Sequence, residues 1–147
     1  MAKGPWNPPK TPFLDKAQQS ALERLTPARQ DPRCLSIADQ TILAVSSAQG
    51  VIDNGGFKYF FGADWPGKPP YSYFSEAYRR IGANEAASAI DKAAALFPFP
   101  KPERDEERRK AFMASLPEDN VFESDQLCGD ITIWEKLEAY AKRLTAH

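Results

Sequence analysis

Histidine and cysteine are nearly absent from this sequence. Its 147 residues contain one histidine, His147, and two cysteines, Cys34 and Cys128. Histidine is the commonest general acid or base in enzymes, and the last residue of a chain is usually too mobile for that role. A zinc site uses three or four ligands, so two distant cysteines do not predict one. We expect both cysteines to fill space in the core and, in a cytoplasmic protein, to be reduced. The sequence therefore predicts no catalytic residues, no metal and no cofactor.

Long apolar runs and a surplus of either charge are absent as well. The chain carries 19 basic and 20 acidic side chains, for a formal net charge of -1. Nucleic-acid-binding proteins usually carry a basic surplus on one face, and polybasic segments attach proteins to membranes, so neither kind of binding is expected. No apolar run approaches the roughly 18 residues of a membrane-spanning helix, and residues 1–12 lack the core of a signal peptide. We therefore expect a cytoplasmic protein.

Most of the 13 prolines fall in three clusters, within residues 5–12, 66–70 and 98–102. Proline lacks an N–H and resists helix interiors, so these clusters predict breaks between helices and an extended, proline-rich N-terminal arm over residues 1–12. Hydrophobic residues make up 42% of the chain and charged residues 27%, as in ordinary globular proteins. A chain of this length usually forms one domain, which we expect over residues 13–147.

Between the breaks, apolar residues recur at helical spacing. The predicted helices cover roughly residues 13–25, 36–54, 57–61, 72–81, 84–97, 103–116 and 132–144. The aromatic run 57–61 has no second such run to pair with in a sheet, so it is expected to be a short helical turn whose rings fill the core. Asn84 is expected to cap the helix that starts there, and residues 103–110 to form a solvated charged face. About seven short helices make a compact all-α bundle.

The segment Asn54-Gly55-Gly56 interrupts the second predicted helix. Two consecutive glycines cost backbone entropy, and asparagine can bond a turn through its side chain, so the helix is expected to stop here in a tight turn. The segment lacks the spacing and the Lys-Ser/Thr pair of a phosphate-binding loop. A mainly structural role is the first interpretation, and contact with a ligand is the alternative.

Acidic residues gather near the end of the chain. Between Glu118 and Glu138 seven acids accompany one base, Lys136, so the local net charge is -6. The segment is either a solvated surface or a docking face for a basic partner. The aromatic stretch from Trp65 to Phe74 also has two interpretations, core packing or an interface anchor. The candidate partner-binding residues are Glu118, Asp119, Glu123, Asp125, Asp130 and Trp65.

Several short motifs occur here in an order that resembles one bacterial family. They are the run Val51 to Phe61, with Asn54, Gly55, Gly56, Phe57, Tyr59 and Phe60; the step Ile81-Gly82-Ala83; an alanine-rich helix ending in Phe97-Pro98; and the charged stretch Arg104 to Arg109. This set, over about Ser36 to Leu116, resembles the DNA-mimic-protein-nineteen-like family, mostly domains of unknown function. Tyr59 stands where that family often has glutamine. The resemblance implies a helical fold and a protein-binding class, since the founding member is an acidic dimer that mimics DNA and occupies a regulator's DNA-binding surface.

Three functions remain open from the sequence. The first is a small protein-binding module without catalysis, monomeric or homodimeric, that inhibits or neutralises a protein partner. The second is a DNA mimic directed at a basic regulator. Duplex DNA carries roughly one charge per 1.7 Å, so with a net charge of -1 only residues 118–138 could imitate it. The third is an unrecognised enzyme with a pocket lined by Asp53, Tyr59 and Asp64.

Overall fold

The structure, a computed structural model, describes residues 10–25 and 32–145. Its α-helices (α) and 3-10 helices (η) are α1 Pro12–Leu25, η1 Pro32–Cys34, α2 Ile37–Gly62, α3 Tyr71–Arg80, α4 Asn84–Ala94, η2 Pro102–Arg104, α5 Glu106–Ser115, η3 Val121–Glu123 and α6 Ile131–Leu144. No strand occurs among the described residues, which confirms the all-α prediction. Most of the predicted N-terminal arm, residues 1–9, and His147 lie outside the described residues.

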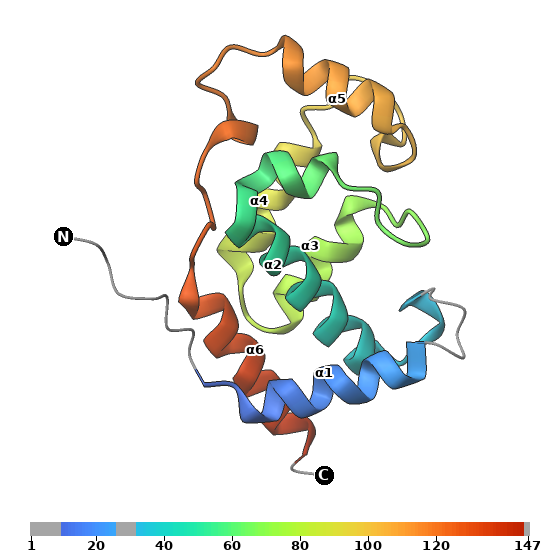
Figure 1. The fold of residues 1–147 in the computed structure, drawn as a ribbon, viewed down its shortest axis with the longest axis vertical. Helices are drawn as coiled ribbons and strands as arrows, with labels where there is room; N and C mark the ends of the chain where they lie inside the picture. Colours follow the sequence, from blue (N-terminus) through green and yellow to red (C-terminus); the bar gives the residue numbers. More distant parts are fainter. Residues whose placement is uncertain (1–9, 26–31, 146–147) are drawn as a thin grey trace, which may run out of the picture.

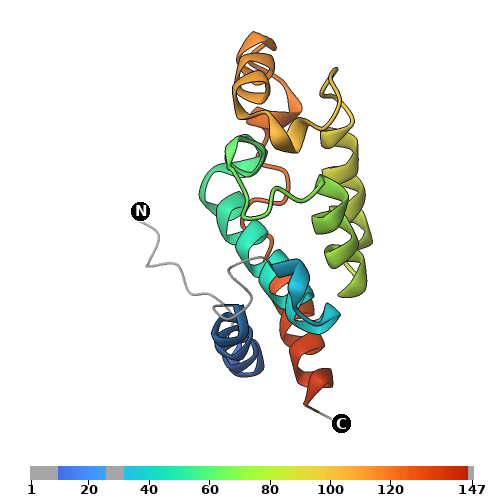
Figure 2. The same cartoon turned by 90° about the vertical axis from the view of Figure 1, so that its right-hand side faces the viewer.

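The long helix α2 organises the bundle. It packs against α1, α3, α5 and α6, while α4 packs against α3 and α1 against α6. Figure 1 shows α2 running through the middle of the molecule, with α1 crossing one end and α5 lying beyond the other. After a quarter turn, α3 and α4 are seen together on one side of α2 (Figure 2). Because residues 116–144 descend from α5 to α6, the acidic segment runs along much of the length of the molecule (Figure 1).

Several helix boundaries differ from the predicted ones. The aromatic run 57–61 is helical, as predicted, and follows a break at Gly55 and Gly56; it is counted as the last part of α2, so the described residues contain six α-helices. The helix α4 ends at Ala94, short of Phe97, and α5 begins at Glu106 because η2 occupies the preceding residues. The predicted cap at Asn84 is wrong: Ala83 holds the N-cap position and no side chain caps the helix.

Aromatic rings fill the core where α2, α3 and η3 meet. Phe57, Phe60 and Phe61 are fully buried, which confirms that this run fills the core. The Phe61 ring packs edge-on against Phe60 at a centroid distance of 4.8 Å and against Phe122 at 5.4 Å. Such edge-to-face pairs add to the stabilisation from area burial alone.

Arg109 corrects the prediction that residues 103–110 form a solvated face. Its side chain is completely buried. Its Nε donates to the Phe61 carbonyl at 2.7 Å, one terminal nitrogen donates to Pro102 at 2.8 Å, and the other to Ala63 at 3.2 Å. The last carbonyls of a helix have no partners within it and carry partial negative charge, which suits a guanidinium. Arg109 therefore fastens α5 to the end of α2.

The same guanidinium also reaches a carboxylate. Arg109 lies 3.2 Å from Asp64, whose own side chain is 42% exposed. The hydrogen bond from Arg109 holds the pKa of Asp64 below its ordinary value. Asp64 is thus committed to an ion pair in the fold.

Tyr71 makes the stability of the domain sensitive to alkaline pH. Burial raises the pKa of Tyr71 to about 12, and the nearby Arg109 opposes this rise only partly. The unfolded chain loses this proton near pH 10. The folded-state pKa is the higher one, so the stabilisation is complete below pH 10 and is lost as pH rises toward 12. We expect Tyr71 to account for about 2 kcal/mol of lost unfolding free energy by pH 12, since one pKa unit is worth about 1.4 kcal/mol.

The measurement is urea denaturation at pH 8, 10 and 11.5. The wild-type chain is expected to lose stability over this range more steeply than Tyr71→Phe, which cannot ionise. Equal slopes for the wild type and Tyr71→Phe would contradict the assignment.

Candidate functional site

The Asn54-Gly55-Gly56 segment breaks the helical geometry inside α2, as the sequence predicts. Gly55 and Gly56 have non-helical backbone angles, and Gly56 has φ 69° and ψ -163°. Only glycine adopts that combination readily. A Cβ on Gly56 would also lie 3.0 Å from the Ser124 carbonyl. The predicted interruption is therefore present, but helix resumes at Phe57 and carries the aromatic run into the core.

Gly55 gives room to an exposed tyrosine. A Cβ at Gly55 would lie 2.3 Å from the ring of Tyr59, so the absence of a side chain lets this ring rest on the backbone of the bend. Tyr59 remains 57% exposed, whereas the rings at 57, 60 and 61 are fully buried. The bend thus has two effects: it directs three phenylalanines inward and fixes one tyrosine on the surface.

Tyr59 borders an apolar depression, here called the Tyr59 hollow, of about 600 Å³. It lies between the end of α2, α5 and η3, and its lining residues are Val51, Lys58, Tyr59, Gly62, Ala63, Lys110, Met113, Ala114 and Glu123. At its edge Lys58 and Glu123 form an ion pair at 3.2 Å. An exposed ring beside an apolar hollow with charged edges is a composition typical of protein interfaces.

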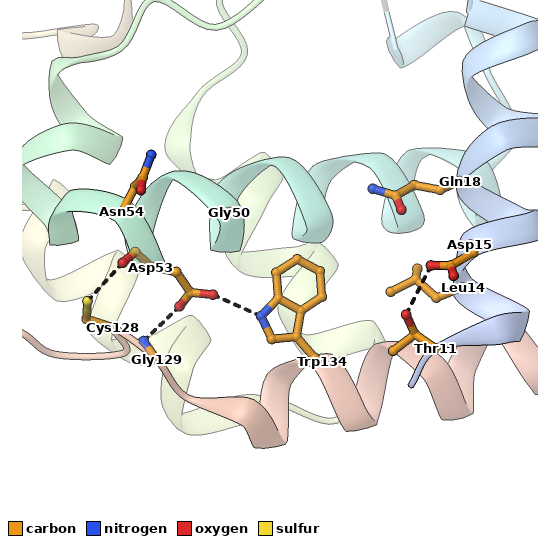
Figure 3. A pocket seen from close by; sticks show the side chains of 10 residues that line it. All are labelled: Thr11, Leu14, Asp15, Gln18, Gly50, Asp53, Asn54, Cys128, Gly129 and Trp134. Carbon is orange, nitrogen blue, oxygen red and sulfur yellow. Dashed lines mark hydrogen bonds between the residues drawn. The ribbon is translucent and has the colours of Figure 1, made fainter. Parts of the chain in front are cut away.

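A second hollow of about 600 Å³, here called the Asp53 hollow, lies among α1, α2 and α6. Figure 3 labels its lining residues. One carboxylate oxygen of Asp53 accepts from the Gly129 amide at 2.8 Å, and the other accepts from the Trp134 indole at 2.9 Å. Cys128 also donates to the Asp53 carbonyl, at 3.3 Å. Asp53 therefore joins α2 to the start of α6 and fixes the indole in the wall of the hollow (Figure 3).

A buried polar network of Gln49 and Tyr78 holds the Asp53 side chain in place. The Gln49 amide donates to Asp53 at 2.8 Å and to the Leu127 carbonyl at 2.7 Å. The hydroxyl of Tyr78 donates to the Gln49 oxygen at 2.9 Å. Burial, with a smaller contribution from Asp53, raises the pKa of Tyr78 strongly, so Tyr78 stays a neutral donor. With these groups satisfied, the position of the Asp53 carboxylate is well defined.

The floor of the Asp53 hollow contains a glycine that the fold does not require. Gly50 lies inside α2, where glycine costs about 0.5–1 kcal/mol relative to alanine. A Cβ there would meet no atom within 4 Å, so no neighbour needs the space that it leaves. A lone glycine in a helical pattern usually has a packing or functional reason.

The acidic segment does not present all of its charges freely. Glu123 pairs with Lys58, and Asp130 caps α6 by accepting from the Thr132 amide at 3.0 Å. Glu138 accepts from the Leu14 amide at 2.7 Å and so caps the start of α1. Among the described residues, no ion pair involves the exposed acids Glu118, Asp119, Asp125 and Glu135.

Trp65 packs against the rest of the fold, whereas both cysteines lie at the surface. The Trp65 indole donates to the Phe60 carbonyl at 3.1 Å, and its half-buried ring packs 5.0 Å from Phe74. The prediction that the cysteines fill the core is wrong, because Cys34 and Cys128 are both exposed. Cys34 belongs to a short 3-10 turn and Cys128 to the surface loop before α6, so neither position packs into the core.

The residues named for an enzyme do not share one pocket. Asp53 lines one hollow and Tyr59 the other, and Asp64 lines neither. Within residues 10–25 and 32–145, no three histidine, cysteine or acidic side chains gather as metal ligands. No helix in this part of the chain combines the length and apolar character needed to cross a membrane.

Comparison with known proteins identifies one family. The model of the family described as DMP19-like protein matches residues 33–144. No curated protein and no solved structure shows significant similarity to the chain. The match takes in the bent helix α2, the whole Tyr59 hollow, the Asp53 hollow except for its α1 side, and the whole acidic segment. Because it spans most of the sequence, the chain belongs to the DMP19-like protein family.

Proposed function

We propose that this chain acts by binding a protein partner, which it inhibits or neutralises, and not by catalysis. The observation that carries the proposal is the Tyr59 ring, more than half exposed yet held against the backbone at Gly55. Rigid aromatic side chains supply large contact areas at low entropic cost and are common anchors of interfaces. The apolar hollow beside the ring gives a partner side chain a place to be buried.

The charges at the edge of the Tyr59 hollow are mixed, since Lys58, Lys110 and Glu123 line it and Glu123 pairs with Lys58. The exposed acids Glu118, Asp119 and Asp125 lie on the connecting segment between α5 and α6, and they favour a partner that carries basic residues near this segment. Complementary rim charges mainly speed association and select the partner, while buried apolar contacts supply affinity. Family membership supports the proposal further, because the resemblance noted above implies a protein-binding class.

DNA mimicry is supported less well by this geometry. A mimic needs carboxylates arrayed like phosphates along a duplex. Here Glu123 is paired, and Asp130 and Glu138 are engaged as helix caps. The four remaining exposed acids of the segment make a discontinuous row, which suits the rim of an interface better than a copy of DNA.

The test is affinity capture from native cell lysate with three immobilised proteins: wild type, Tyr59→Ala and Leu22→Ala. Leu22 is 51% exposed on α1 and lies outside the Tyr59 hollow, so it is a matched control for loss of exposed apolar surface. We expect a protein retained by the wild type and by Leu22→Ala to fall about ten-fold or more with Tyr59→Ala, the loss typical of an interface hot spot. Equal retention by both variants, or no protein retained by the wild type, would contradict the proposal.

A further inference from the structure

We propose that the Asp53 hollow is a binding site for a guanidinium or ammonium group. This site is separate from the Tyr59 hollow, and the inference does not depend on the proposed function. Its volume of about 600 Å³ falls within the range of small-ligand pockets. Three features of its lining identify the ligand chemistry: its charge, its aromatic wall and its glycine floor.

Among the described residues, the charged side chains that line the hollow are all acidic. Asp15 of α1 and Asp53 of α2 both line it, and none of the described residues in its lining is basic. The donors to these carboxylates among the described residues are neutral: Thr11 donates to Asp15 at 3.0 Å, and Gln49, Gly129 and Trp134 donate to Asp53. Neutral hydrogen bonds leave the carboxylate charge in place, so a cation entering the hollow would find two acids that no base in the described part of the chain pairs with.

The aromatic wall suits a cation in particular. The indole of Trp134 stands between Asp53 on one side and Asp15 on the other (Figure 3). Tryptophan is the best of the aromatic side chains at attracting ammonium and guanidinium groups. Its hydrogen bond to Asp53 fixes the ring before a ligand arrives, which lowers the entropic cost of binding. Gln18 extends from α1 toward the same space and offers an amide oxygen as a further acceptor (Figure 3).

The third feature is Gly50, whose cost to the stability of α2 no contact within the fold explains. Gly50 weakens α2, yet no neighbouring atom would meet a side chain there. A glycine at such a position lets a ligand approach the helix backbone closely. The open space above Gly50 is the hollow itself, so keeping this residue without a side chain keeps the site open.

The test follows the indole N–H signal of Trp134 by NMR, assigned by its loss in Trp134→Phe. Arginine amide is titrated against the wild-type chain, and acetyl-arginine amide is compared with acetyl-citrulline amide, its uncharged counterpart of nearly equal shape. We expect a saturable shift with arginine amide in the low millimolar range or tighter, and binding of acetyl-citrulline amide that is weaker than that of acetyl-arginine amide by about ten-fold or more. Added sodium chloride should weaken the binding of arginine amide.

Two pairs of variants locate the site. Gly50→Leu should fill the hollow and abolish the shift, whereas Gly62→Leu should not, although its Cβ also meets no atom within 4 Å on the same helix. Asp15→Asn should weaken binding by roughly three- to ten-fold, whereas Glu76→Gln removes one exposed charge from α3 and should leave binding unchanged. Thermal denaturation of each variant confirms that it is folded.

The source of the cation is settled by a second probe, the blocked tripeptide acetyl-Gly-Arg-Gly-amide. Binding of arginine amide at least as tight as that of the tripeptide identifies a free amine or guanidine as the ligand. Tripeptide binding tighter by about ten-fold identifies an arginine side chain of a peptide. Either result supports the proposal. Absence of a saturable shift with both probes, or a shift that survives in Gly50→Leu, overturns it.

Discussion

Replacing Arg109 with alanine is expected to lower the free energy of unfolding by about 4 kcal/mol. The substitution removes the donors for the carbonyls of Phe61, Ala63 and Pro102 and the counter-ion of Asp64. Each buried acceptor that loses its donor costs about 1–3 kcal/mol, and the guanidinium also leaves a cavity. This is a large part of the 5–15 kcal/mol that stabilises a typical domain.

Urea denaturation of Arg109→Ala, Arg109→Lys and Arg108→Ala measures the effect. Lysine keeps the charge but has fewer donors and no planar fork, so Arg109→Lys should lose roughly half as much as the alanine variant. Arg108 is exposed; it makes a surface ion pair with Asp105, and its guanidinium lies 5.7 Å from the centre of the Phe99 ring, so its removal should cost about 1 kcal/mol or less. A loss below about 1 kcal/mol for Arg109→Ala would show that the buried clamp is not what holds α5.

Gly56→Ala is expected to destabilise the chain by about 3 kcal/mol. At φ 69° and ψ -163° an alanine is strained, and its Cβ would press against the Ser124 carbonyl at 3.0 Å. Relief of this strain would move the helical segment that starts at Phe57 and carries the core rings. Thermal or urea denaturation gives the magnitude.

Gly50→Ala is the matched control on the same helix, with the opposite sign. It should stabilise the chain by about 0.5–1 kcal/mol, because alanine favours helix and nothing obstructs the new methyl group. If Gly56→Ala cost no stability relative to the wild type, the bend at Gly56 would not have the backbone geometry described here.

Much of the fold could be read from the sequence because local patterns encode it. The apolar spacing of residues 36–54 and 132–144 predicts two helices that the structure contains, as α2 and α6. The run of aromatics after Gly56 predicts a buried helical turn, and three of its rings are indeed fully buried. The order of short motifs pointed to the family that the comparison then identified.

The features that the sequence did not predict depend on contacts between residues far apart in the chain. Arg109 stands in a charged run that looks solvated, and its acceptor at Phe61 lies 48 residues away. In the sequence Glu138 looks like another surface acid, but its carboxylate caps α1 at Leu14, 124 residues earlier. No local pattern indicates such pairings, so burial of a charge and use of an acid as a remote cap appear only in three dimensions.

The two hollows could be foreseen only in part. Tyr59 and Asp53 stand out in the motif, but the sequence does not show that they lie on different surfaces. Trp134 was missed because its partner Asp53 is 81 residues away. Gly50 did give a signal, as a glycine inside a predicted helix with no turn to form.

The most direct test of the central claim, protein binding through the Tyr59 surface, is site-specific photocrosslinking in native cell lysate. The photoreactive residue p-benzoylphenylalanine replaces Tyr59 in one protein and Leu22 in another; both positions are more than half exposed. The account predicts one discrete crosslinked protein from position 59, competed away by excess wild-type chain, and no discrete product from position 22. A discrete product from position 22 alone, or no product from position 59, would contradict it.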